Sequence, residues 1–199
     1  MAFYNQYLYL GDYWGSIRVY DLADPSHPKF VRLKEYFLPR DLSILGNYLL
    51  VSDTAYGLII YTLDDPSNPV WVWSKAGTIR NYRDVEGYGK YALIARNDAG
   101  SRIKIFGVGN LQTIGPPTDF VSTRFIEALS KYENTLIVSC GEDGVIGYDL
   151  TGIPSLGKIW QADTPGYARM AKRIGNYLYV ADMSGICVYE IVYKTDDAT

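Results

Sequence analysis

The sequence of 199 residues contains a single histidine, His27, and only two cysteines, Cys140 and Cys187. One histidine excludes a histidine metal cluster and a Ser–His–Asp catalytic triad. Two cysteines exclude a disulfide framework and leave at most one bridge. The motifs CxxC, GxxxxGKS/T and a helix-opening GxGxxG are all missing. We therefore expect no metal, no cofactor and no enzymatic activity.

The sequence also lacks a strong charge of one sign and a long apolar run. Its net charge is −3 with both signs interspersed, which is not the electrostatic pattern of a protein that binds nucleic acid or anionic membranes. No apolar run approaches the roughly 18 residues of a spanning helix, and the opening residues MAFYNQYLYLGD lack the basic start and apolar core of a signal peptide. We expect no nucleic-acid partner and no membrane insertion, and nothing in this chain directs export.

What the sequence does contain is repetition. The turn LADPSHP at residues 22–28 returns as LDDPSNP at residues 63–69, which is 63 − 22 = 41 residues later. Both copies have the residues of a corner: an aspartate can bond its own downstream backbone, and two prolines fix φ. An extended run follows each corner, so each corner is expected to join two strands. Tyrosine outnumbers phenylalanine 19 to 6, and this excess suits half-buried strand surfaces.

The repeat extends over the whole chain in five copies. Each copy has an apolar strand, a loop with glycine, and a second strand built around one aromatic residue. A tight corner, mostly Gly-Asn or Gly-Lys, precedes each apolar strand after the first and is a hairpin signal. The apolar strands begin 41, 43, 44 and 42 residues apart, at Tyr7, Tyr48, Tyr91, Thr135 and Tyr177.

Four antiparallel strands every ~40–45 residues is the period of a β-propeller blade. We therefore predict an all-β protein, a β-propeller of about five blades, within one domain over residues 1–199. The repeats are expected to begin near residues 1, 40, 83, 127 and 169. The first blade begins within its innermost strand and the last lacks its outer strand. An immunoglobulin-like sandwich does not predict five matching copies, and a linear solenoid usually has a shorter period.

The residues GNYLYVAD…GICVYEI and GNYLLVSD…GLIIYTLDDPSNP resemble the LVIVD repeat of bacterial and archaeal β-propellers. The resemblance is close in the first, second and fifth copies and weaker in the third and fourth, which lack the full Asp-Pro corner. It implies a propeller fold more firmly than any activity, and it implies an extracellular or cell-surface location.

Three arrangements of the blades fit the sequence. They are a closed five-bladed ring with one thin blade, a segment of a larger ring, and a ring completed by another chain. We expect the closed ring, since each blade must bury both faces against neighbours.

Charged residues recur beside the hairpins. Counting outward from each corner places Arg40 opposite Asp53 and Arg169 opposite Asp182, and we expect these pairs to hold the strand ends together. Asp12 is left without a counterpart, because its partner would precede Met1.

In the third blade the same count places Arg83 opposite Arg96, and in the fourth it places Glu127 opposite Cys140. Two facing arginines need a negative group. Glu127 could supply it as an inter-blade salt bridge, and the alternative is an anion-binding corner at the mouth of the channel.

Aromatic residues mark two further candidate surfaces. Tyr13, Trp14 and Tyr56 fall in loops, where binding residues usually lie on a rigid scaffold. Trp71 and Trp73 alternate in VWVW, so we expect both on one face of an outer strand. There they either pack against the next blade or form a patch on the rim that binds a partner.

The leading functional hypothesis is a non-enzymatic interaction module that binds a protein partner, or a second copy of itself, through loops or blade rim. The first alternative is a carbohydrate-binding propeller that stacks loop aromatics on sugar rings. The second is a hydrolase or lyase with two carboxylates in the central channel, about 5–9 Å apart.

Overall fold

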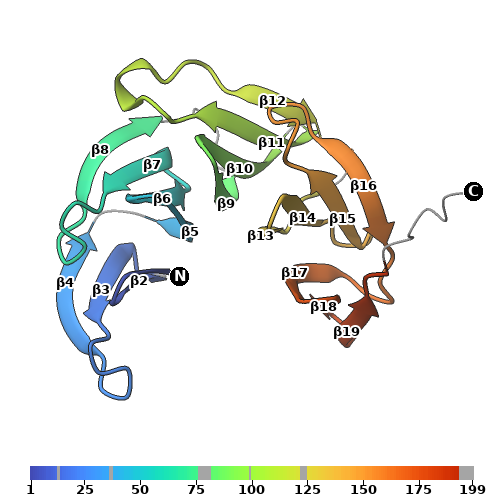
Figure 1. The fold of residues 1–199 in the computed structure, drawn as a ribbon, viewed down its shortest axis with the longest axis horizontal. Coiled ribbons are helices and arrows are strands. Elements are labelled where there is room, and N and C mark those ends of the chain that lie inside the picture. The colour runs from blue at the N-terminus through green and yellow to red at the C-terminus, as the bar shows by residue number, and fades with distance from the viewer. Residues whose placement is uncertain (13, 36–37, 76–81, 99, 122–124, 193–199) are drawn as a thin grey trace, which may run out of the picture. The chain divides into compact units, whose positions relative to one another are not determined.

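The computed structural model describes residues 1–12, 14–35, 38–75, 82–98, 100–121 and 125–192 (Figure 1). Within these ranges the chain forms nineteen strands and one short 3-10 helix, Leu111–Thr113. They group into two compact units, residues 1–126 and residues 127–199, which are treated separately below. No described helix is long and apolar enough to cross a membrane.

The first unit contains three antiparallel sheets of four strands each. The first sheet has the order β1 (Ala2–Tyr4), β2 (Tyr7–Asp12), β3 (Ser16–Asp21), β4 (Lys29–Glu35). The second has the order β5 (Pro39–Leu45), β6 (Tyr48–Asp53), β7 (Gly57–Thr62), β8 (Val70–Lys75). The third has the order β9 (Tyr82–Tyr88), β10 (Tyr91–Asp98), β11 (Gly100–Gly107), β12 (Thr118–Val121).

The second unit contains a sheet of four strands and a sheet of three. The fourth sheet has the order β13 (Ala128–Tyr132), β14 (Thr135–Ser139), β15 (Val145–Asp149), β16 (Gly157–Ala162). The fifth has the order β17 (Ala168–Ile174), β18 (Tyr177–Asp182), β19 (Gly185–Glu190). The five sheets begin at Ala2, Pro39, Tyr82, Ala128 and Ala168, and the all-β blade architecture is confirmed. The assignment of all 199 residues to one domain stays a prediction.

The two incomplete blades are also as predicted. The innermost strand of the first sheet, β1, has only three residues and pairs with β2 from Ala2 to Tyr4. Among the described residues, the fifth sheet has no strand beyond β19.

One hydrogen bond repeats in all five blades and shows that they are built alike. The residue after the third strand donates its backbone N–H to the carbonyl of the hairpin corner between the first two strands, at 2.7–2.8 Å. The five donor–acceptor pairs are Leu22–Gln6, Leu63–Asn47, Val108–Lys90, Leu150–Asn134 and Ile191–Asn176. The bond ties the end of each third strand to the start of its blade.

Within each unit the core lies between consecutive sheets, because residues that alternate along a strand point to opposite faces. In β6, Leu49 and Val51 pack with Tyr9 of the first blade, whereas Leu50 packs with Ile94 of the third blade. The second sheet therefore needs apolar residues on both of its faces. In the second unit a corresponding cluster joins the fourth and fifth sheets.

The repeated turns have the predicted corner chemistry. Asp24 accepts from the backbone N–H of Ser26 at 3.0 Å, and Asp65 does the same for Ser67. His27 bonds Asp24 through its ring nitrogen Nδ1, at 2.9 Å, so the single histidine belongs to this turn.

Candidate functional site

Among the described side chains, three aspartates at the ends of second strands bind the neighbouring loops, and we call Asp12, Asp53 and Asp182 the root aspartates. Asp53 is fully buried and accepts three backbone N–H groups, from Leu38 at 2.6 Å, Ala55 at 2.7 Å and Tyr56 at 2.8 Å. Its carboxylate thereby joins the segment entering the blade to the loop between β6 and β7.

Asp182 repeats this arrangement in the fifth blade. It accepts from the backbone of Gly166 before the blade at 3.1 Å and from Ser184 in the following loop at 2.7 Å. The hydrogen bond from the Ser184 hydroxyl is the largest cause that lowers the pKa of Asp182, to about 2. Asp182 therefore binds these backbone donors as a charged carboxylate.

The predicted cross-strand pairs of arginine and aspartate are wrong in register. A β-bulge after Pro39 leaves Asp53 opposite Pro39 instead of Arg40, and a bulge after Ala168 leaves Asp182 opposite Ala168. A bulge adds one residue to one strand, so every position beyond it shifts by one relative to a simple count from the corner. Asp12, expected to lack a partner, binds Arg18 Nε at 2.8 Å and accepts the backbone N–H of Ser16.

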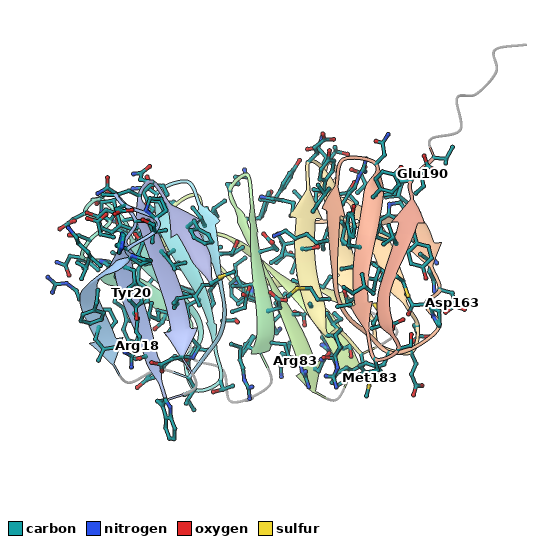
Figure 2. All side chains as sticks on the ribbon, turned by 90° about the horizontal axis from the view of Figure 1, so that it is seen from below. Arg18, Tyr20, Arg83, Asp163, Met183 and Glu190 are labelled. Atoms are coloured by element: carbon teal, nitrogen blue, oxygen red, sulfur yellow. The ribbon has the colours of Figure 1, made fainter. Side chains whose placement is uncertain are left out.

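The same shift separates Arg83 from Arg96, so the prediction that these two arginines face each other is wrong. A bulge places Arg96 opposite Tyr82, with the Arg96 guanidinium 6.0 Å from the Tyr82 ring centre. Arg83 lies over the ring of Phe125 at 4.7 Å. Each guanidinium therefore contacts an aromatic ring, and the anion-binding corner stays a prediction. Figure 2 labels Arg83 near the lower end of the green strands.

Glu127 belongs to the second unit and binds within it. Its carboxylate accepts from the hydroxyl of Tyr167 at 2.7 Å and from Arg169 Nη1 at 3.3 Å, and Arg169 also lies over the Tyr167 ring at 5.0 Å. This cluster connects the fourth blade to the fifth. An inter-blade salt bridge of Glu127 was expected, and the partner in the structure is Arg169.

Arg40 lines a hollow at the loop end of the first two blades. The hollow has a volume of about 260 Å³, and its walls are Asp12, Leu38, Pro39, Arg40 and Thr54. The bulge frees Arg40 from the β5–β6 ladder, so its side chain is exposed beside the root aspartate Asp12. A cation, an anion and the exposed apolar side chain of Leu38 thus meet at one surface.

Two of the three predicted loop aromatics lie two residues along the chain from a wall of this hollow, and the third, Tyr13, is outside the described residues. Trp14 is 86% exposed and donates its backbone N–H to Asp12 at 3.0 Å. Tyr56 lies two residues after Thr54 in the loop, and it donates its backbone N–H to Asp53. The Tyr56 ring meets the Trp71 ring edge-on at 5.5 Å between centres.

Trp71 and Trp73 do not share a face of β8, so that expectation is wrong. A bulge pairs Trp71 with Tyr61 and Trp73 with Ile60, which point to opposite faces of the second sheet. Trp73 packs forward on Phe106 of the third blade at 6.1 Å, whereas Trp71 lies on the other side with Tyr61 and Tyr56. Trp71 therefore extends the loop aromatics, and Trp73 belongs to the core between blades.

The sequence analysis did not mark Asn97 or Leu38, and both take part in hydrogen bonds at the ends of second strands. The buried side chain of Asn97 makes two hydrogen bonds to the backbone of Ile126. Its amide nitrogen donates to the Ile126 carbonyl, and its amide oxygen accepts the Ile126 N–H at 3.0 Å. Asn97 thus ties the end of β10 to the segment that precedes β13, whereas Asp53 and Asp182 bind the segment that precedes their own blade. Leu38 was missed because it precedes the strand in an irregular segment without a repeat partner of like character.

The described residues contain no group of three or more His, Cys, Asp and Glu side chains placed to hold a metal ion. Both cysteines are free thiols. Cys140 is buried, and this burial raises the pKa of its thiol to about 12. A thiol with a raised pKa is a poor nucleophile at neutral pH.

Comparison with known proteins identifies the repeat. The family model of the LVIVD repeat matches residues 1–33, 39–75 and 165–188, which are the first, second and fifth copies. No curated protein matches the sequence.

Solved structures with the same fold are distant in sequence. A chain of the mitotic checkpoint complex is 13% identical with a TM-score of 0.75, and the match covers 96% of this chain and 60% of that one. Raptor from Chaetomium thermophilum is 12% identical with a TM-score of 0.72 over 96% of this chain and 18% of that one. The computationally designed Ika8 protein is 14% identical with a TM-score of 0.67, and this chain spans 57% of its length.

At such identities these structures support the fold alone, and they are propeller proteins. Three stretches of the chain therefore match the LVIVD repeat, and its sheets are β-propeller blades.

Proposed function

We propose that this chain is a non-enzymatic interaction module that binds a protein partner through the loop end of its first two blades. We call the exposed part of this end the loop surface, and it consists of Trp14, Leu38, Arg40, Thr54 and Tyr56. The observation that carries the proposal is Trp14, a large aromatic side chain that is 86% exposed and whose backbone N–H is bound by Asp12, a wall of the hollow. Exposed aromatic residues and arginine are the side chains that most often dominate binding at protein interfaces.

The loop surface rests on a fixed backbone, which favours binding. Asp53 holds the N–H groups of Leu38, Ala55 and Tyr56, and Thr54 donates its N–H to the carbonyl of Leu38 at 3.3 Å. Asp12 holds the N–H of Trp14 in the same way. Loops that are ordered before binding lose less conformational entropy when a partner docks.

A second candidate, carbohydrate binding, is favoured by the same two aromatic rings. Trp14 and Tyr56 offer apolar ring faces, and Asp12 and Arg40 offer polar groups beside them. We rank this second because the exposed Leu38 adds an apolar contact that a protein partner uses better than a sugar does.

We expect the double variant Trp14→Ala/Arg40→Ala to lose the partner. Wild-type chain and variant are immobilised, exposed to a lysate of the source organism, and compared by quantitative mass spectrometry. At least one protein held by the wild type should fall about tenfold or more with the variant, because two anchors of the surface are removed. Circular dichroism of the variant should be unchanged, since both side chains are exposed.

The matched control is Phe30→Ala, which removes an exposed aromatic ring from β4, away from the loop surface. It should retain the partner. If the double variant retains every captured protein, the loop surface is not the binding surface. A glycan-array signal that disappears with the double variant, without loss of any protein, would replace the protein partner with a carbohydrate.

A further inference from the structure

The outer edge of β19 is an unpaired strand edge among the described residues. The four other sheets each have an outer strand beyond the third strand, and the fifth does not. Ile191 donates its backbone N–H to Asn176, on the β18 side. Because hydrogen bonding alternates along an antiparallel strand, Ile186, Val188 and Glu190 direct their backbone groups outward. Met183 and Glu190 mark the two ends of this edge in Figure 2.

This edge lacks the features that protect other edges in the same chain. Strand β4 carries three basic residues in KFVRLKE, β16 carries a lysine in GKIWQA, and β12 has only four residues. Charged side chains and short length discourage pairing with other chains. The edge strand GICVYE has neither lysine nor proline, and its Ile186 and Val188 are exposed to 76% and 53%.

An apolar hollow adjoins the same edge. It has a volume of about 430 Å³ and lies between β16 and β19. Its walls include the apolar or aromatic side chains of Ile159, Trp160, Leu178 and Tyr189, together with Glu190. The hydroxyl of Tyr189 donates to the carbonyl of Asp163 at 2.6 Å, so its ring is held in place as one wall.

The first two blades show what fills the equivalent position. Their third-strand tyrosines face an aromatic ring from the outer strand, Tyr20 with Phe30 at 5.8 Å and Tyr61 with Trp71 at 6.3 Å between centres. Tyr189 is the corresponding tyrosine of the fifth blade. The hollow beside it is therefore of the right kind for an aromatic ring carried by an added strand.

The charge at the end of the edge points to a basic residue. In the first blade Asp21, the residue after Tyr20, lies opposite Lys29 of the outer strand. Glu190 follows Tyr189 in the same way, so an added strand in this register places its own residue opposite a carboxylate. Opposite charges directly across two strands stabilise the pairing.

We propose that β19 binds an extended segment of a partner protein as the fourth, antiparallel strand of the fifth blade. The segment has a basic residue opposite Glu190, followed by an aromatic residue opposite Tyr189 that enters the hollow. Backbone hydrogen bonds supply affinity and the side-chain hollow supplies selectivity. This edge belongs to the second unit and the loop surface belongs to the first, so the strand-addition proposal does not depend on the proposed function of the loop surface.

The test uses the peptide PKFVRLKE, which is the sequence of residues 28–35 and has the required Lys-Phe pair. Fluorescently labelled peptide is titrated with the full chain and followed by anisotropy. We expect a Kd of about 10–100 μM, and binding at least about tenfold weaker for the peptide in which alanine replaces phenylalanine. The variant Val188→Pro, which removes an outward N–H, should abolish binding, and Val188→Thr, which keeps it, should not.

Several outcomes overturn the proposal. No binding at about 1 mM peptide, or binding indifferent to both Val188→Pro and the alanine peptide, removes the strand-addition site. A wild-type dimer that Val188→Pro makes monomeric assigns the edge to a second copy instead. Binding that occurs only after residues 193–199 are deleted assigns it to the chain's own end. The alanine peptide tests the hollow even if Val188→Pro fails to fold.

Discussion

Replacing Asp53 with alanine should lower the free energy of unfolding of the first unit by about 2–4 kcal/mol. The Asp53 carboxylate is fully buried and accepts three backbone N–H groups, from Leu38, Ala55 and Tyr56. Hydrogen bonds to a charged acceptor are stronger than neutral ones, and a buried donor left without an acceptor is costly. Urea unfolding followed by circular dichroism measures the loss.

The conservative variant Asp53→Asn separates the hydrogen bonds from the volume of the side chain. Asparagine keeps one oxygen, which can still accept from Ala55 and Tyr56, but its amide group cannot accept from Leu38. We therefore expect Asp53→Asn to be intermediate between wild type and Asp53→Ala. If the alanine variant were as stable as wild type, Asp53 would not fasten the loops.

Replacing Gly144 with alanine should destabilise the second unit by about 3 kcal/mol or more. Gly144 has φ +70°, a conformation that side chains with a Cβ adopt at a cost. A Cβ at this position would also lie 2.2 Å from the backbone oxygen of Ala162 and 3.0 Å from the Cα of Asp163. Backbone atoms of the outer strand cannot rotate away as a side chain can. Urea unfolding of the variant measures the effect.

The matched control for this prediction is Gly175→Ala in the same unit. Gly175 has φ +58°, and a Cβ added there would meet nothing within 4 Å, so only the conformational cost of about 1–2 kcal/mol applies. The difference between the two variants isolates the close approach of β16 to the loop before β15. Equal losses would mean that β16 does not pass so close to Gly144.

The blade architecture could be predicted from sequence because its signals are local and repeated. Each apolar strand is short, each corner has its glycine or Asp-Pro chemistry, and five copies confirm one another. Leu49, Leu50 and Val51 alternate between two clusters, as expected of a strand with both faces buried.

The pairing of individual side chains was harder to predict because β-bulges leave no clear mark in sequence. Bulges at Arg40, Arg83 and Arg169 shift the register by one residue and separate each arginine from its expected partner. The bulge in β8 likewise sends Trp71 and Trp73 to opposite faces. A count from the hairpin corner assumes an unbroken ladder of paired residues. A single extra residue in one strand therefore makes the predicted pairs beyond it wrong.

The candidate loop surface was only partly visible in the sequence. Trp14 and Tyr56 stood out as large aromatic residues in glycine loops, and of the two the structure exposes Trp14 more. The contributions of Arg40 and Leu38 depend on the bulge after Pro39 and on the hydrogen bond from Leu38 to Asp53. Neither feature is encoded by residue type alone, so the hollow that these residues line emerges only in three dimensions.

The central claim is that the five repeats fold into equivalent blades, and amide hydrogen exchange tests it most directly. The backbone N–H groups of Leu22, Leu63, Val108, Leu150 and Ile191 each donate to the hairpin corner of their own blade. We expect all five amides to exchange at least about 100-fold more slowly than in an unfolded chain. An amide of this set that exchanges at the unfolded rate while the other four are protected would contradict the equivalence of the blades.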